Sequence, residues 1–218
     1  MAYKRLVNKN STELEAYMLE ERIGSFEIMA LEEKVRQIHF NPPIPKLQES
    51  MLSAKDTLIM FWDFHVKPVV EIVKNMACKY SGDFDAVWLA AILHDIARAH
   101  DKQPHDKIGS EMAYDFLRDN RFSARISSSV RAIIITHSCK KYKPESLEQK
   151  ILATADALAH FQHPFYLWYH TISPEPFEKL LVWNLKKINH DFHEKIFFDE
   201  ERESVRAEYE IMKKWCTR

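Results

Sequence analysis

Glycine occurs only three times in this chain of 218 residues. Tight turns and phosphate-cradling loops depend on glycine, because it adopts positive φ angles without steric cost. The sequence can therefore contain neither a P-loop nor the glycine fingerprint of a dinucleotide-binding fold. The scarcity of glycine also disfavours all-β folds, which need many tight turns.

Helical periodicity runs through almost the whole chain and predicts an all-α, multi-helix bundle. Capping-box patterns begin at Thr12 and Ser146, and Gly24 and Gly82 are predicted helix stops, the second followed by Asp83 as an N-cap. After a first helix that ends near Gly24, the expected helices span about 25–40, 47–61, 66–81, 84–99, 106–119, 124–138, 147–162, 175–190 and 200–215.

The proline-rich segment 41–45 is the strongest break in the chain. A separate unit of about 40 residues would be marginally stable, so we expect residues 1–45 to be a helical arm packed on the main body. Residues 46–163 are the predicted core, and residues 164–218 a C-terminal helical cap of the same domain.

Composition excludes several classes of protein. Apolar residues make up 46% of the chain, enough for a sizeable core, and the net charge of −1 argues against a nucleic-acid coat or membrane-surface role. The cysteines Cys78, Cys139 and Cys216 are far apart, which indicates reduced thiols rather than a disulfide framework. The N-terminal residues lack the apolar stretch of a secretory signal, and the longest apolar run, 86–93, is too short to cross a bilayer. We therefore expect a soluble, cytoplasmic protein.

Histidine and aspartate stand out where the helices are most apolar. Of four His-Asp dipeptides, only His94-Asp95 directly follows a long apolar run, and a buried carboxylate is costly unless it is paired or binds a metal. His137 and Asp156 share faces with core residues of two further helices, and His65 stands before the preceding helix. A single such histidine is more often a hydrogen-bonded core residue, but the combination favours a metal site built inside a bundle.

The order His65, His94-Asp95, Asp156 resembles that of the HD-domain superfamily of metal-dependent phosphohydrolases. Residues 89–98, LAAILHDIAR, resemble its AALLHDIGK signature, and residues 155–158, ADAL, resemble its closing motif. The resemblance covers about residues 60–160. It implies that these four residues hold a first metal.

Some members of that superfamily hold a second metal with two further histidines. Residues 105–110, HDKIGS, resemble the family element HxxxGA, so the resemblance makes His105 and His137 ligands of a second metal, with Asp95 bridging the two. His100 competes with His105 for this place, and its polar surroundings favour a surface role.

The chain departs from the family pattern after the His-Asp pair, where Ala97-Arg98 replaces Gly-Lys. Arg98 keeps the positive charge and has a planar fork suited to phosphate oxygens, although a salt bridge to a nearby acid is the alternative. Lys102 is a further candidate for substrate binding, and Lys140 and Lys141 would attract anions in the same way, unless they are ordinary surface lysines.

Many aromatic residues follow Pro164. They either pack as a helical cap or wall a pocket and stack on a base, with Tyr166 and Trp168 the closest in sequence to Asp156.

The resemblance implies hydrolysis of a small phosphoester or phosphoanhydride, most simply a nucleotide, by metal-activated water. Asp95 and Arg98 would be catalytic, and one or two ions of Mn, Fe, Co, Ni or Zn would suit the ligands. The patterns of the nucleotide-triphosphohydrolase and (p)ppGpp-hydrolase branches are absent, which disfavours those substrates. Two alternatives stay open: a di-iron oxygenase of the same fold, and a non-catalytic nucleotide-binding sensor or scaffold. The sequence also leaves the oligomeric state open, a homodimer included.

Overall fold

The computed structural model describes residues 23–40, 60–100, 102–173 and 175–217. Every regular element in these ranges is helical, which confirms the predicted all-α fold. The elements are α3 (Ser25–Phe40), η1 (Trp62–Val66), α5 (Lys67–Tyr80), α6 (Phe84–Leu93), η2 (Arg98–His100), α7 (His105–Asp119), α8 (Ala124–Ile134), α9 (Leu147–Gln162), α10 (Phe165–Ile172), α11 (Phe177–His190), η3 (Asp191–Lys195), α12 (Asp199–Ser204) and α13 (Arg206–Cys216). None of these helices is long and apolar enough to cross a membrane.

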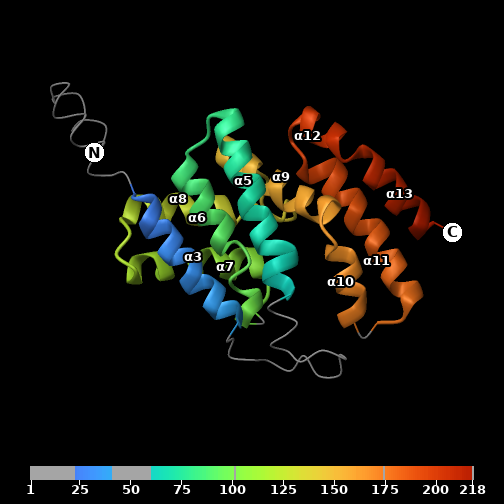
Figure 1. Ribbon diagram of the computed structural model, residues 1–218, viewed down its shortest axis with the longest axis horizontal. Coiled ribbons are helices and arrows are strands. Elements are labelled where there is room, and N and C mark those ends of the chain that lie inside the picture. The colour runs from blue at the N-terminus through green and yellow to red at the C-terminus, as the bar shows by residue number, and fades with distance from the viewer. Residues whose placement is uncertain (1–22, 41–59, 101, 174, 218) are drawn as a thin grey trace.

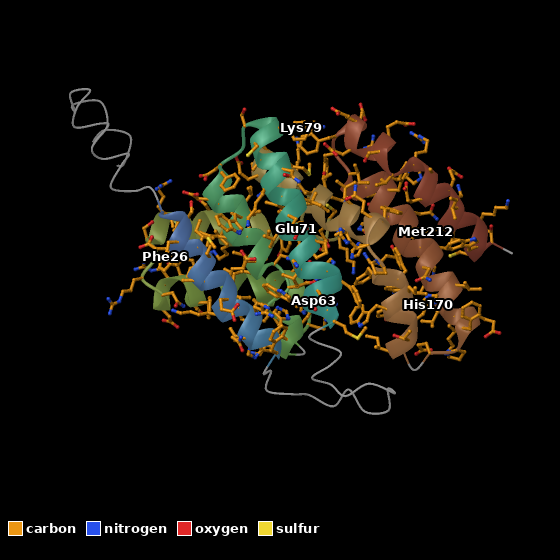
Figure 2. All side chains as sticks on the ribbon, in the orientation of Figure 1. Phe26, Asp63, Glu71, Lys79, His170 and Met212 are labelled. Carbon is orange, nitrogen blue, oxygen red and sulfur yellow. The ribbon has the colours of Figure 1, made fainter. Side chains whose placement is uncertain are left out.

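Helix α9 lies between two groups of helices (Figure 1). In the first group α5 packs along α9, α6 packs on α5 and α8, and α3 and α7 complete the outside. In the second group α11 packs on α13 and η3, and η3 returns to α9. Figure 2 labels Asp63 and Glu71 in the first group, and His170 and Met212 in the second. The cavity described below lies where the two groups face each other across α9.

Helices α6 and α9 form the centre of the core. All residues from Ala86 to Leu93 are buried, as their apolar run predicts. The Asp83 side chain accepts a hydrogen bond from the Ala86 N–H at 3.1 Å, which confirms the predicted N-cap of α6. Ser146 and Gln149 form the predicted capping box of α9. These local signals place both helices where the sequence expects them.

Two helices end earlier than their periodicity predicts. Helix α6 ends at Leu93 and α8 at Ile134, so His94 and His137 lie in turns that follow the helices. The backbone there switches to i→i+3 hydrogen bonds, as in the 3.1 Å bond from the His137 N–H to the Ile134 carbonyl. These tight turns redirect the chain immediately at the two histidines.

Two π-helices replace expected connections. Residues Trp62–Val66 form a π-helix continuous with α5, although a break was expected there. The Lys67 N–H bonds to the Trp62 carbonyl across this wide turn, just before Pro68, which has no N–H to donate. The second π-helix, Asp191–Lys195, extends α11.

Further differences lie in the C-terminal part. Helix α10 lies in a stretch that we expect to be a connection because prolines flank it, and Pro164 is in fact its N-cap residue. The predicted helix 200–215 is divided at Val205 into α12 and α13. The αL residue that ends α5 is Ser81, with φ 58°, rather than Gly82.

Within the predicted N-terminal arm, helix α3 packs on α6 through Ile28, Leu31 and Val35, which are buried. The expected first helix with its capping box at Thr12, the proline-rich segment 41–45 and nearly all of the expected helix 47–61 lie outside the described residues. The division into arm, core and cap stays a prediction.

Candidate metal centre

The fold brings six of the predicted site residues together from five parts of the chain. They are His65 on η1, His94 and Asp95 after α6, His105 at the start of α7, His137 after α8, and Asp156 in the middle of α9. All six side chains are buried. They form two groups, His65 with His94 and Asp156, and Asp95 with His105 and His137.

In the first group, nitrogen and oxygen atoms face one point. The Nε2 atom of His65 lies 3.2 Å from the Nε2 atom of His94 and 3.2 Å from Oδ1 of Asp156. Two imidazole nitrogens and a carboxylate oxygen at such distances are a donor set that a transition metal accepts.

Asp95 lies between the two groups. Its Oδ2 atom lies 3.4 Å from His65 Nε2 and 3.6 Å from His94 Nε2, and its Oδ1 atom lies 3.6 Å from His105 Nε2 and 3.9 Å from His137 Nε2. Oδ1 is buried and has no hydrogen-bond partner among the described residues. An unsatisfied buried carboxylate oxygen is costly, and a cation at this point would satisfy it.

Hydrogen bonds to the backbone orient two of the histidines. His94 Nδ1 lies 2.8 Å from the Ala91 carbonyl, and His137 Nδ1 lies 2.6 Å from the Ile134 carbonyl. A carbonyl oxygen only accepts, so each Nδ1 carries the proton and each Nε2 directs a lone pair into the site. Histidine ligands of metals usually have this arrangement.

Burial and charge favour the metal-binding protonation state at Asp95 and at three of the four histidines, whereas at His65 the hydrogen bonds to Asp156 and Asp95 outweigh burial and raise the pKa. Burial lowers the pKa of His94, and lowers the pKa values of His105 and His137 to about 4. Burial alone would raise the pKa of Asp95, but the Arg98 guanidinium and the nearby imidazoles outweigh it and hold that pKa well below its usual range. Neutral imidazoles and an ionised carboxylate are the forms that bind metals.

A cavity of about 420 Å³ opens over these side chains. Its basic lining residues are Arg98, Lys140, Lys186, Lys187 and Lys195, and its aromatic ones are Phe61, Phe165, Tyr169 and Trp183. The Tyr169 and Trp183 rings stack with centroids 4.5 Å apart. The cavity thus combines a floor of candidate metal ligands, positive charge and an aromatic wall.

The position of Arg98 fits both roles that the sequence leaves open, contact with a substrate phosphate and a salt bridge to an acid. It lines the cavity, with its side chain 42% exposed, and its Nε lies 2.9 Å from Asp95 Oδ2. One of its terminal nitrogens lies 3.2 Å from His105 Nε2. Lys102 and Lys141, by contrast, are not among the lining residues, and His100 belongs to neither ligand group.

Sequence reasoning missed two buried side chains beside the ligands. The His160 ring lies parallel to the His65 ring at 4.8 Å, and its position one helical turn after Asp156 was a signal for its proximity. Lys195 contacts Asp156 although it lies 39 residues further along the chain, and no local sequence pattern predicts this contact. Tyr166 and Trp168, which the sequence leaves open as either cap or wall residues, are buried outside the lining, and their neighbours Phe165 and Tyr169 line the cavity.

Comparisons with known proteins agree with this geometry. The family model of the HD domain matches residues 62–160. The crystal structure of a predicted HD superfamily hydrolase from an uncultured Thermotogales bacterium aligns with a TM-score of 0.54 over 95% of each chain, at 20% sequence identity. At this identity the likeness shows a common fold. No curated protein matches the sequence.

Proposed function

We propose that the protein is a metal-dependent phosphohydrolase that cleaves a nucleotide or another small phosphoester or phosphoanhydride. The match of residues 62–160 to the HD domain family supports this proposal. The observation that carries the proposal is the pair of adjacent buried groups of candidate ligands, with Asp95 between them, at the floor of a cavity with a basic wall. Such an enzyme acts on ester bonds of small phosphorylated substrates.

Different residues of the site would hold the two metals. His65, His94, Asp95 and Asp156 would hold the first metal, and His105 and His137 the second, with Asp95 between them. Divalent transition metals supply an activated water and polarise a phosphoryl oxygen at neutral pH.

Basic side chains bind the anionic part of the substrate. Arg98 is held by Asp95 at 2.9 Å, yet remains partly exposed in the cavity, so its guanidinium can meet phosphoryl oxygens and offset charge in the transition state. Lys140 and Lys186 are exposed, line the same cavity and have no ion-pair partner among the described residues. Their charge draws anionic substrates towards the floor.

The aromatic wall favours a substrate with a planar ring. Trp183, Lys186, Lys187 and His190 follow at spacings of three, four and seven residues, so one face of α11 presents them all to the cavity. With a phosphate at the basic floor, a base would lie towards Trp183 and Tyr169, where stacking is favourable. These contacts support a nucleotide within the wider class of phosphoesters.

Metal content and turnover, measured on the same preparations, test the proposal. We expect about two transition metals per wild-type chain by mass spectrometry and hydrolysis of nucleoside monophosphates faster than of glycerol phosphate. Asp95→Ala removes the carboxylate that lies between the two groups and should lose metal and turnover while keeping its helical circular dichroism. The control Asp115→Ala changes an exposed aspartate on α7 and should behave as wild type.

Other outcomes select the alternatives. Full hydrolysis by Asp95→Ala would contradict the proposed chemistry. Oxygen uptake by an iron-loaded protein without hydrolysis would favour the di-iron oxygenase, and nucleotide binding without metal or turnover would favour a sensor.

A further inference from the structure

A largely buried polar cluster contacts Asp156 from the C-terminal part of the chain, where α10 and η3 pack on α9 (Figure 1). It consists of His160, Tyr166, Lys187, Asp191 and Lys195, of which all but His160 follow the part of the chain that matches the HD domain. Lys195 is 3% exposed and Asp191 is fully buried. Burying an ammonium is costly, and replacing a whole buried ion pair with apolar side chains is often neutral or stabilising, so such a pair is weak evidence for a purely structural role.

Lys195 contacts one oxygen of Asp156 and leaves the other to the histidines. Its Nζ atom bonds to Oδ2 of Asp156, whereas Oδ1 lies 3.2 Å from His65 Nε2. Lys195 Nζ lies between two carboxylates, that of Asp156 and that of Asp191. The contact therefore determines which carboxylate oxygen is turned towards the metal ligands.

Asp191 braces this arrangement from behind. Its Oδ1 atom lies 3.8 Å from Lys195 Nζ. Its Oδ2 atom accepts hydrogen bonds from His160 Nδ1 at 3.0 Å, Tyr166 Oη at 3.2 Å and Lys187 Nζ at 2.9 Å. Three donors from three different helices bind one carboxylate, so the side chain of Asp191 has little freedom to move.

The backbone of Lys195 is tied to α9 close to Asp156. The Thr154 hydroxyl donates to the Lys195 carbonyl at 3.2 Å and accepts from the Phe197 N–H at 3.1 Å. Asp191 and Lys195 are also the first and last residues of the π-helix η3, an irregularity found frequently at functional sites. The main chain and the side chain of Lys195 are thus both positioned relative to Asp156.

We infer that Lys195 is a positioning residue of the candidate metal centre, holding Asp156 by Oδ2 so that it offers Oδ1 alone to a bound metal. The inference rests on the proposed function, because it needs the metal site to exist. It assigns the C-terminal helices a direct part in the geometry of that site. Partners of this kind, behind a ligand, typically change metal affinity 10- to 100-fold when they are removed.

Cobalt(II) titration reports on the geometry of Asp156 without any substrate. In Lys195→Met the carboxylate is free to rotate or to use both oxygens, so we expect the visible absorption spectrum of bound Co(II) to change and its affinity to fall about tenfold. Lys195→Arg keeps a cationic donor and should restore most of the wild-type spectrum. Lys187→Met leaves Lys195 in place but weakens its brace, so a smaller change in the same direction is expected, and it serves if Lys195→Met fails to fold.

The matched control is Lys214→Met, which removes an exposed lysine of α13 that is not among the residues lining the cavity. Its Co(II) spectrum should equal that of wild type. Unchanged spectra in Lys195→Met and Lys187→Met would overturn the positioning role, as would tighter binding with an unchanged spectrum, which would mean that Lys195 merely opposes the charge of the metal. Wild-type protein that binds no Co(II) would instead overturn the proposed function itself, and the positioning role with it.

Discussion

At the scale of single residues, Asp95 shows how the turn after α6 builds the site. One oxygen faces His65 and His94 and the other faces His105 and His137, so one carboxylate connects ligands from four parts of the chain. The Arg98 N–H donates a hydrogen bond to the Asp95 carbonyl at 2.9 Å, which forms an i→i+3 turn. This turn places the Arg98 guanidinium next to the Asp95 carboxylate.

Replacing Arg98 tests its part in turnover. Arg98→Met removes a charged donor from the place where negative charge develops, and such a loss typically lowers kcat by about 100- to 1,000-fold. The metal content should stay at the wild-type value, since none of the six proposed ligands is changed. Steady-state kinetics with metal analysis on the same samples measures both quantities.

Lys102→Met is the natural comparison, because Lys102 is exposed and lies outside the cavity lining. It should retain wild-type kcat. An equal loss in both variants would mean that general positive charge, rather than the placement of Arg98, supports the reaction.

At the scale of elements, the ends of helices position three of the proposed metal ligands. Helices α6 and α8 stop just before His94 and His137, and α7 begins at His105. Helix α9 instead carries Asp156 in its interior, where the backbone is most rigid, and its start is secured by the capping box of Ser146 and Gln149. We therefore expect that a substitution at the start of α9 can lower the stability of the protein without changing the geometry of the site.

Removing the cap tests that separation. In Ser146→Ala the Gln149 N–H loses its side-chain acceptor, at 3.3 Å, and we expect the free energy of unfolding to fall by about 1 kcal/mol. Because Asp156 lies more than two turns further along α9, metal affinity should stay unchanged. Urea unfolding and metal titration give the two values.

Ser204→Ala provides a comparison, since its exposed hydroxyl donates only to the Glu201 carbonyl at 2.8 Å. Its unfolding free energy should remain within about 0.5 kcal/mol of wild type. A loss of metal affinity in Ser146→Ala would contradict the separation of helix stability from site geometry.

At the scale of the whole molecule, the site depends on parts of the chain far apart in sequence. The C-terminal helices supply Lys187, Asp191 and Lys195 beside α9, and helix α3 closes the opposite group of helices. His39, at the end of α3, is fully buried beside Phe61, and neither of its ring nitrogens has a hydrogen-bond partner among the described residues.

This histidine makes folding sensitive to acid. Burial lowers the pKa of His39 to about 4, whereas the unfolded chain takes up the proton near the usual pKa of about 6.5. Its contribution to stability is therefore full above about pH 6.5 and is lost as the pH falls towards 4. Between pH 7 and pH 5 the loss amounts to about 2 kcal/mol.

The variant His39→Leu has no proton to take up, so its unfolding free energy should fall by about 2 kcal/mol less than that of wild type over this range. Urea unfolding of both proteins at pH 7 and pH 5, in the presence of a chelator, measures the difference. Equal losses in the two proteins would refute the assignment.

The sequence by itself determined the helical class, the caps of α6 and α9, and the order of the His and Asp residues from His65 to Asp156 that the fold brings together. These features are local: periodicity, capping residues and motif spacing each depend on neighbours within a few turns, and the apolar runs around His94 and Asp156 already require burial.

Only the tertiary structure decided which residues from distant parts of the chain contact the proposed metal ligands. Lys195 reaches Asp156 across 39 residues, and Trp183 and Tyr169 come together from α11 and α10. The π-helix η3 carries Lys195, and the early ends of α6 and α8 place His94 and His137 in turns. Such contacts depend on how whole helices pack and where the chain turns, and pairing between positions far apart leaves no period or spacing in a single sequence.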